Sequence, residues 1–402
     1  MNLCITPGPL EGTVTPPPSK SQAHRAILAQ LLAGGGTVSN LETSQDIEAT
    51  QRCAAALKAQ GTDLPLLDCG ESGSTLRFLI PIALALRGGG RFTGRGRLMD
   101  RPQKPYFDIF DEKGIFYEQK DGALTVKGEL TPGEYCLPGN VSSQFVTGLL
   151  YALPLLDGDS EIVLTSKLES KSYVDITLAV LKDFGVTAEH QFYNRFVRGA
   201  GPEGQWYEKY QVPGNQTFQP RDYTIEADWS QAAFWMAAEF LGSDVEVEGM
   251  NYDSVQGDKG IDKLFVLLGR RQDYSLNASV FPDLVPPLAL MAAVRSGTVR
   301  LANAARLRIK ESDRLSSVTQ VLNALGADVE EGPDFLHITG RDGLEGGVTV
   351  DCCNDHRIAM MAAIAATRCK KPVTLLGAEC VNKSYPSFWD EYKRLGGEFD
   401  VL

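Results

Sequence analysis

The stretch PPPSKSQAHRAILAQ, residues 16–30, places Lys20, Ser21 and Arg25 where a helix is expected to begin, ahead of an apolar run. A helix N-terminus already carries about half a positive charge from its unpaired amides, so added cations are unfavourable there unless an anion binds. The pattern therefore predicts an anion-binding site at this helix end. Taken alone, the same stretch also fits an ordinary capped helix with solvated charges.

Similar residues recur at other expected helix starts and in the loops between them. The helix starts contribute Ser74, Arg77, Ser142, Ser143, Gln144, Asp228, Asp283, Asp355, His356 and Arg357. The loops contribute Arg101, Ser170, Tyr173, Arg306, Arg308, Lys310, Glu311, Arg314 and Lys383. Many cations and few carboxylates favour a pocket for small polyanions. For each motif alone, a solvated charged surface or an ion-paired helix cap stays open as the alternative.

The composition limits the choice of partner. Acidic residues outnumber basic ones by 51 to 39, which gives a net charge of −12 at pH 7. Nucleic acid and anionic membranes need a broad basic surface, so we expect neither as a partner. The segment GESGSTLR lacks the GxxxxGK[ST] pattern, and no GxGxxG is found at a strand-to-helix turn, so a nucleotide site has little support.

The cysteines and the apolar segments bear on the cellular compartment. The eight cysteines show no CxxC pair and no His/Cys cluster with zinc-ligand spacing, which indicates reduced thiols. The segment MNLCITPGPLEG lacks the basic start and apolar centre of a signal peptide. The apolar stretch FVTGLLYALPLL is too short to span a bilayer. We therefore expect a cytoplasmic protein.

A repeated pattern organises the chain. Six times, a helix with a polar start and a Gly-rich end is followed by a strand, a polar loop and a second helix. The first helices begin at SKSQAHR, SGSTLRF, NVSSQF, ADWSQAA, FPDLVPP and NDHRIAM. The second halves at 90–115 and 242–268 match the pattern least well. Mixed units of this kind predict an α/β fold, and six of them predict two domains of three units.

Interruptions of the pattern predict where the chain passes between the domains. They lie at TPPPSK, residues 15–20, and at NQTFQPRDYTIEAD, residues 215–228. We therefore expect one domain to combine residues 1–18 with 227–402, and the other to comprise residues 19–226.

The first helices are strongly apolar after their starts, as in FVTGLLYAL and IAMMAAIAA, which predicts that they are buried and expose only their ends. Ser19 and Asp228 are followed three residues later by Gln and have capping-box spacing, and Ser142 and Asn354 can also cap. If the six helix starts face one another, their free amides and neighbouring side chains line a single cleft.

Eight motifs, in this order and across nearly the whole chain, resemble the EPSP synthase (3-phosphoshikimate 1-carboxyvinyltransferase) family of enolpyruvyl transferases. They are PPSKSQAHRAILAQLLAGG, GESGSTLRF, DRPQKPYFD, VSSQFVTGLL, SKSYVDITLAVLKDFGV, RIKESDRL, DHRIAMMAA and CVNKSYPSF. The resemblance implies two hinged domains of three βαβαββ units each, with the helices buried at the centre of each domain as in an inside-out α/β barrel. It also implies that residues 19–226 form the shikimate-phosphate-binding domain.

The resemblance further implies transfer of the enolpyruvyl group of phosphoenolpyruvate to the 5-hydroxyl of shikimate 3-phosphate, a step of the shikimate pathway to chorismate and the aromatic amino acids. Addition followed by elimination, through a tetrahedral intermediate, gives 5-enolpyruvylshikimate 3-phosphate and phosphate. Two substrates with two phosphates and two carboxylates account for the many arginines and lysines. These cations supply the charge stabilisation, so we expect no metal and no cofactor. We also expect a monomer.

Residue by residue, the resemblance implies that Asp283 takes the hydroxyl proton and that Glu311 exchanges a proton at the enol carbon, with Lys20 and Lys310 as further catalytic residues. The residues implied for shikimate 3-phosphate are Lys20, Ser21, Arg25, Ser142, Ser143, Gln144, Ser170, Tyr173, Asp283, Arg306 and Lys310. Those implied for phosphoenolpyruvate are Lys20, Gly73, Arg101, Gln144, Arg314, Arg357 and Lys383.

Two positions depart from the family pattern. Glu71 stands where many members have Asn, and its carboxylate would repel phosphoenolpyruvate unless it is ion-paired, protonated or turned away. Arg306 stands where some members have Asn, which would add a contact to the shikimate phosphate.

Two alternatives stay open. A UDP-N-acetylglucosamine enolpyruvyl transferase would share the fold and the donor, but its loop cysteine is missing from TGRGRLMDRP, and Lys20–Ser21 replaces its usual Lys–Asn pair. A non-catalytic anion-binding relative would have no physical reason to keep Asp283, Glu311 and Lys310 in register.

Overall fold

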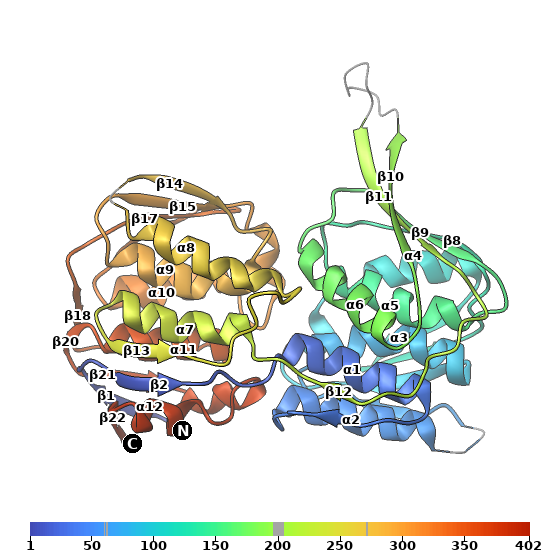
Figure 1. Ribbon diagram of the computed structural model, residues 1–402, viewed down its shortest axis with the longest axis horizontal. Helices are drawn as coiled ribbons and strands as arrows, with labels where there is room; N and C mark the ends of the chain where they lie inside the picture. The colour runs from blue at the N-terminus through green and yellow to red at the C-terminus, as the bar shows by residue number, and fades with distance from the viewer. Residues whose placement is uncertain (60, 62, 196–204, 271) are drawn as a thin grey trace. The chain divides into compact units, whose positions relative to one another are not determined.

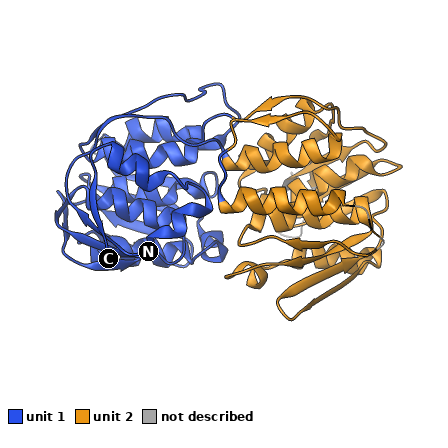
Figure 2. Ribbon diagram, turned by 90° about the horizontal axis from the view of Figure 1, so that it is seen from below, with its two compact units in different colours: residues 1–19, 42–44, 226–402 blue, residues 20–41, 45–225 orange. Residues whose placement is uncertain are grey.

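The computed structural model describes residues 1–59, 61, 63–195, 205–270 and 272–402 (Figure 1). The chain divides into two units (Figure 2), of which unit 1 comprises Met1–Ser19, Glu42–Ser44 and Glu226–Leu402, and unit 2 comprises Lys20–Leu41 and Gln45–Ile225. The boundaries expected from the sequence, after residues 18 and 226, lie one residue away from these. The sequence did not predict that residues 42–44 group with unit 1.

Unit 2 is built around apolar helices. Helices α1 (Lys20–Ala33), α3 (Gly73–Arg87) and α5 (Ser143–Ala152) bury most of their residues. The further helices are α2 (Gln45–Lys58), α4 (Lys104–Lys113) and α6 (Lys171–Asp183), with short 3-10 turns η1 (Leu98–Asp100) and η2 (Leu153–Leu155). Because α3 and α5 are apolar on almost every side, they are stable only where other elements cover all of their faces.

Among the residues of unit 2 that the structure describes, the strands form two four-stranded sheets and one short pair. The first sheet has the order β4–β5–β7–β6, with β4 Leu66–Asp68, β5 Gly89–Thr93, β6 Phe116–Lys120 and β7 Ala123–Lys127. The second has the order β10–β11–β9–β8, with β8 Gly133–Leu137, β9 Ser160–Leu164, β10 Glu189–Arg195 and β11 Gln205–Val212. The pair consists of β3 (Val38–Ser39) and β12 (Tyr223–Thr224). The antiparallel β10 and β11 project from the unit (Figure 1).

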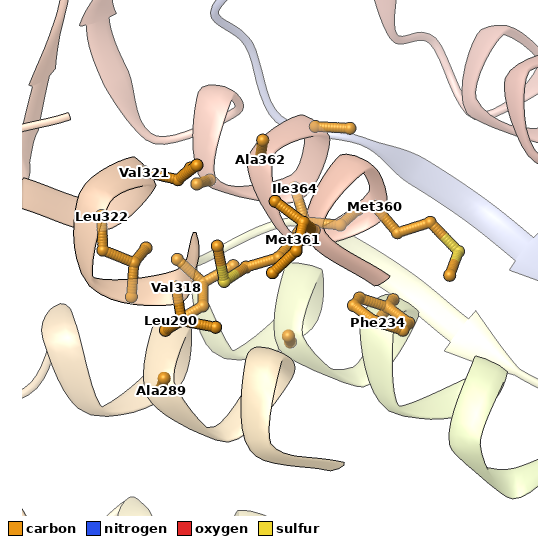
Figure 3. Packing of buried hydrophobic residues seen from close by; sticks show 14 of the residues in the cluster. Phe234, Ala289, Leu290, Val318, Val321, Leu322, Met360, Met361, Ala362 and Ile364 are labelled. Carbon is orange, nitrogen blue, oxygen red and sulfur yellow. The ribbon is translucent and has the colours of Figure 1, made fainter. Parts of the chain in front are cut away.

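Unit 1 repeats this plan. Its central helices are α7 (Trp229–Phe240), α9 (Val285–Ala293) and α11 (His356–Ala366), and every residue of α9 and α11 is buried. The further helices are α8 (Ile261–Leu268), α10 (Arg314–Ala324) and α12 (Phe388–Arg394), with 3-10 turns η3 (Gly257–Gly260), η4 (Pro282–Leu284), η5 (Ala305–Ile309) and η6 (Ala378–Lys383). Figure 3 shows the side chains of Phe234, Leu290, Val318 and Met361 packed between these helices.

The strands of unit 1 form two four-stranded sheets and two pairs. One sheet has the order β14–β15–β17–β16, with β14 Tyr274–Asn277, β15 Thr298–Ala302, β16 Asp328–Glu331 and β17 Leu336–Thr339. The other has the order β19–β21–β1–β22, with β1 Leu3–Thr6, β19 Thr349–Asp351, β21 Val373–Leu376 and β22 Glu398–Val401. The pairs are β2 (Glu11–Val14) with β13 (Asp244–Val247), and β18 (Leu344–Gly346) with β20 (Cys369–Lys371).

The four larger sheets share one topology. In each, two parallel strands connected through a central helix are followed by an antiparallel pair, as in β4–α3–β5–α4–β6–β7. In the fourth sheet, β1 pairs with both β21 and β22, so the N-terminal strand completes a unit formed at the other end of the chain. The buried helices and the repeated units confirm the predicted fold class. The segment 90–115, which matched the pattern poorly, nevertheless contains most of strand β5 and all of helix α4 of a complete unit.

Side chains cap the central helices. The carboxylate of Asp228 accepts the backbone N–H groups of Ser230 and Gln231, and the hydroxyl of Ser142 accepts that of Gln144, as expected. At α11 the expected cap, Asn354, is wrong: Asp355 accepts the N–H of Arg357 instead. Asn354 has a left-handed φ of 49°, so it belongs to the turn before the helix. Within the described ranges, no helix has the length and apolar composition needed to cross a bilayer.

Candidate active site

In unit 2, the start of α3 brings together three residues expected at a phosphoenolpyruvate site. A Cβ atom on Gly73 would lie 2.6 Å from Nη1 of Arg101 and 3.7 Å from Oε1 of Gln144. Arg77 donates from Nη1 to this Oε1 at 2.8 Å and from Nη2 to the carbonyl of Pro102 at 3.1 Å. Arg77 therefore holds both Gln144 and the segment that carries Arg101.

A carboxylate of the protein lies at the cationic start of α1. Lys20 Nζ and Asp46 Oδ2 are 2.9 Å apart, and both side chains are largely buried. Asp46 belongs to the first turn of α2, where it also adds a favourable negative charge. The sequence analysis did not foresee this partner of Lys20.

Arg25 is buried and directed into unit 2. Its Nε donates to Thr177 Oγ1 at 2.8 Å, Nη1 donates to the carbonyl of Ser21 at 2.6 Å, and Nη2 donates to the carbonyl of Tyr173 at 2.8 Å and to Thr147 Oγ1 at 3.3 Å. Burial lowers the pKa of Arg25 to about 10. Arg25 thus contacts two other expected site residues, Ser21 and Tyr173, directly through their carbonyls, and two threonines that the sequence analysis missed accept further bonds from it.

Two helix starts supply the expected serines. Ser142 caps α5, and the buried Ser143 is its first residue. Ser170 precedes α6, is buried, and has a left-handed φ of 53°. A residue with a side chain adopts this conformation at some cost in free energy, and such strain is concentrated at functional sites. Backbone N–H groups at these helix ends are suited to binding phosphate or carboxylate.

In unit 1, Asp283 lies among three cations. Its Oδ1 accepts a bond from Arg314 Nη1 at 2.9 Å and lies 3.7 Å from Lys310 Nζ, while Oδ2 accepts a bond from Arg357 Nη2 at 3.0 Å. Burial on its own raises the pKa of Asp283, but Arg357, Lys310 and Arg314 together hold it well below its usual range. Asp283 is therefore a stable carboxylate in this structure.

Arg314 joins Asp283 to two further carboxylates. Its Nη2 donates to Glu311 Oε2 at 2.7 Å, and its Nε donates to Asp355 Oδ2 at 2.8 Å. Asp355 is fully buried and also accepts a bond from Ser312 Oγ at 3.0 Å. The sequence analysis noted Asp355 as a helix start but did not assign it to the site. Opposite charges and good geometry make this buried network possible.

Lys310 and Lys383 are two further cations of unit 1 that were expected at the site. Burial lowers the pKa of Lys310 to about 8, an effect that Asp283 opposes and that Arg314 and Arg306 reinforce. Lys383, at the end of η6, donates from Nζ to the carbonyl of Asn354 at 2.7 Å. The expected site residues of unit 1 therefore surround the starts of α10 and α11.

Glu71 extends along the loop that follows β5. A Cβ atom on Gly96, which has a left-handed φ of 57°, would lie only 2.8 Å from Oε2 of Glu71. The carboxyl group of Glu71 is thus packed against the backbone of Gly96. At Gly73, the residue expected near phosphoenolpyruvate, the nearest neighbour on the Cβ side is Arg101 and not Glu71.

Solved structures of enolpyruvyl transferases have the same fold. The TM-score is 0.76 with the EPSP synthase from Acinetobacter baumannii, at 23% identity with both chains covered completely. It is also 0.76 with the enolpyruvyl transferase NikO from Streptomyces tendae, at 17% identity and 99% and 98% coverage. This chain therefore has the fold of these enolpyruvyl transferase structures.

Sequence comparison identifies the family within this class. The family model for EPSP synthase (3-phosphoshikimate 1-carboxyvinyltransferase) matches residues 5–392. A curated 3-phosphoshikimate 1-carboxyvinyltransferase from Clostridium beijerinckii is 43% identical, over 99% of this chain and 98% of the relative. This chain belongs to the EPSP synthase family.

Proposed function

We propose that this chain transfers the enolpyruvyl group of phosphoenolpyruvate to the 5-hydroxyl of shikimate 3-phosphate and releases phosphate. One observation carries the proposal: Asp283, Glu311 and Lys310, which can exchange protons, lie in one partly buried network with Arg314 and Arg357, which can bind an anion. Membership of the EPSP synthase family favours the shikimate acceptor over UDP-N-acetylglucosamine.

In the addition step, the 5-hydroxyl oxygen bonds to C2 of phosphoenolpyruvate and loses its proton to Asp283, while Glu311 delivers a proton to C3. In the elimination step, Glu311 takes a proton back from C3, the bond from C2 to the phosphate oxygen breaks with its electron pair going to that oxygen, and the proton held by Asp283 leaves with the phosphate. Asp283 is a weak base in this structure, because three cations stabilise its carboxylate form. Phosphoenolpyruvate bound to Arg314 and Arg357 would share their charge, and this would raise the basicity of Asp283.

The remaining roles follow the geometry of each unit. In unit 2, the residues proposed for the phosphate and ring of shikimate 3-phosphate lie on α1, α5 and α6. The residues proposed for phosphoenolpyruvate in this unit lie at the start of α3, together with Arg101 and Gln144. Unit 1 supplies Arg306 and Lys310 for shikimate 3-phosphate, and Lys383 for phosphoenolpyruvate. The cations provide the electrostatic stabilisation. We further propose that the protein works as a cytoplasmic monomer without a cofactor.

The direct test measures phosphate release by the purified protein. We expect release only when shikimate 3-phosphate and phosphoenolpyruvate are both present. Release with UDP-N-acetylglucosamine as acceptor would assign the protein to the alternative reaction. No release with either acceptor would favour a non-catalytic anion-binding protein.

Gly73→Ala tests the phosphoenolpyruvate site. The added Cβ would lie 2.6 Å from Nη1 of Arg101, so the guanidinium must move. We expect KM for phosphoenolpyruvate to rise about tenfold, with little change in KM for shikimate 3-phosphate. The matched control is Gly260→Ala, whose Cβ meets nothing within 4 Å. A KM for phosphoenolpyruvate equal to that of the parent would contradict the placement of this site.

The lowered pKa of Lys310 predicts that activity falls at alkaline pH. With its pKa lowered to about 8, the side chain loses its proton as the pH rises through this value, whereas an ordinary lysine stays charged. If the positive charge is needed, kcat/KM of the free enzyme should fall above about pH 8. Lys310→Arg keeps its charge and should lose this decline, even if its activity is lower. An unchanged profile in that variant would assign the decline to another group.

A further inference from the structure

Arg308 lies two residues before Lys310, and each of its three guanidinium nitrogens donates a hydrogen bond within unit 1. Nη1 donates to both carboxylate oxygens of Asp313, at 3.1 and 2.9 Å, and to Glu331 Oε1 at 3.1 Å. Nη2 donates to the carbonyl of Gly332 at 2.6 Å, and Nε donates to that of Pro333 at 3.0 Å. The sequence analysis grouped Arg308 with the anion-binding cations, but these contacts give it a different task.

The Arg308–Asp313 pair closes a short loop. Residues 309–312 lie between the two partners, and this segment contains both Lys310 and Glu311. One guanidinium nitrogen, Nη1, contacts both oxygens of Asp313, and such an ion pair between the ends of a segment restricts the conformations of the residues between them. The closed segment is held at a second point, because Ser312 Oγ donates to the buried carboxylate of Asp355 at 3.0 Å.

The remaining contacts attach this loop to the sheet. Glu331 ends β16, and the carbonyls of residues 332 and 333 lie in the turn between β16 and β17. Asp313 is also the N-cap of α10, where its side chain accepts the N–H of Ser316 at 3.2 Å. Arg308 therefore connects the start of α10 to the β16–β17 turn, with Lys310 and Glu311 between its two anchors. A lysine could not make all of these contacts, because it lacks the planar fork.

We propose that Arg308 is a positioning residue for the reaction: by closing the loop of residues 309–312 onto Asp313 and the β16–β17 turn, it sets the positions of Lys310 and Glu311. This inference rests on the proposed function. Arg308 acts through the two residues that it orients. Misplacement of a reacting group by about 1 Å can cost up to about 10²-fold in rate, so loss of this clamp should be visible in turnover.

The test compares Arg308→Gln with the parent. We expect kcat to fall about tenfold or more, while the dissociation constant of shikimate 3-phosphate, measured by calorimetry, changes by less than about threefold because most of its proposed contacts lie in unit 2. The matched control is Arg341→Gln. Arg341 also pairs with a carboxylate in unit 1, Asp328, at 3.1 Å, but it is 54% exposed and does not contact the loop. Its kcat should equal that of the parent.

A second comparison separates positioning from a general structural role. If Arg308 acts by placing Lys310 and Glu311, the factor by which Arg308→Gln lowers kcat should shrink on a background that carries both Lys310→Gln and Glu311→Gln, since both oriented groups are already inactive there. A full, independent factor on that background would overturn the proposal, as would a folded Arg308→Gln protein with parental kcat.

If Arg308→Gln does not fold, Arg308→Lys decides the question. This variant keeps the charge and should fold, but it cannot reach the carboxylates and the carbonyls together. A lowered kcat in Arg308→Lys supports positioning, and parental kcat overturns it. Failure of the proposed function looks different, because the parent itself would then release no phosphate from the two substrates.

Discussion

Glu311→Gln is expected to lower kcat by about 10²-fold or more while leaving the binding of shikimate 3-phosphate nearly unchanged. The amide has the size of the carboxylate but cannot accept or deliver the proton that the enol carbon needs. Its oxygen can still accept the bond that Arg314 Nη2 now donates to Glu311 at 2.7 Å, so the buried guanidinium should stay in place. Phosphate release gives kcat, and calorimetry gives the dissociation constant.

The loss should affect both halves of the reaction. A proton is delivered to C3 during addition and removed during elimination, so the variant should neither accumulate the tetrahedral adduct nor turn it over quickly when it is supplied. The control is Glu330→Gln, which removes an exposed carboxylate of β16 in the same unit. Parental kcat in Glu311→Gln would show that another group exchanges protons at this carbon, and Lys310 would then be the first candidate.

The central helices were predictable because burial on all sides leaves a strong signal in the sequence. Helix α11 reads HRIAMMAAIAA and α9 reads VPPLALMAA, and a helix this apolar has no face that is stable in water. Caps were predictable where the capping residue directly precedes such a run, as with Asp228. The N-terminus of α11 was harder to place, since Asn354 and Asp355 are adjacent and both can cap. The backbone, with Asn354 in a left-handed conformation, decided between them.

Long-range partners were not predictable from local patterns. Asp46 binds Lys20 across 26 residues, and Thr177 binds Arg25 across 152 residues. A threonine or an aspartate inside a helix has the same local signature whether it faces solvent or a buried cation. The sequence therefore favoured an anion at the start of α1 but contained no sign that the protein places one of its own carboxylates there.

In the nine-residue motif RLRIKESDR, too, the partners of the charged side chains were not predictable from the local pattern. Its alternating charges suggested either a solvated surface or a common anion pocket. In the structure, two arginines of the motif have different contacts. Arg308 contacts Asp313 and Glu331, whereas Arg314 contacts Asp283 and Asp355. Such a division depends on which elements pack around the motif, and tertiary packing is what a short stretch of sequence does not specify.

Replacing Arg314 with Gln should destabilise the protein by about 3–5 kcal/mol at neutral pH, because it leaves Asp283, Glu311 and Asp355 without the buried cation that they share. Arg314 is 1% exposed, so water cannot replace it without rearrangement. Urea unfolding measures the loss. The exposed Arg341→Gln is the control and should change the free energy of unfolding by no more than about 0.5 kcal/mol.

The pH dependence of this loss follows from the carboxylates. In the parent, the pKa of Asp283 is lowered on folding, so its contribution to stability is present above its unfolded pKa and disappears as the pH falls through the folded value. In Arg314→Gln the carboxylate of Asp283 loses one of its three cations, and protonation of Asp283 relieves its repulsion and desolvation. The difference in unfolding free energy between parent and variant should therefore shrink as the pH falls toward about 4. A difference independent of pH would mean that Arg314 stabilises unit 1 by packing, and that the three carboxylates are neutralised in another way.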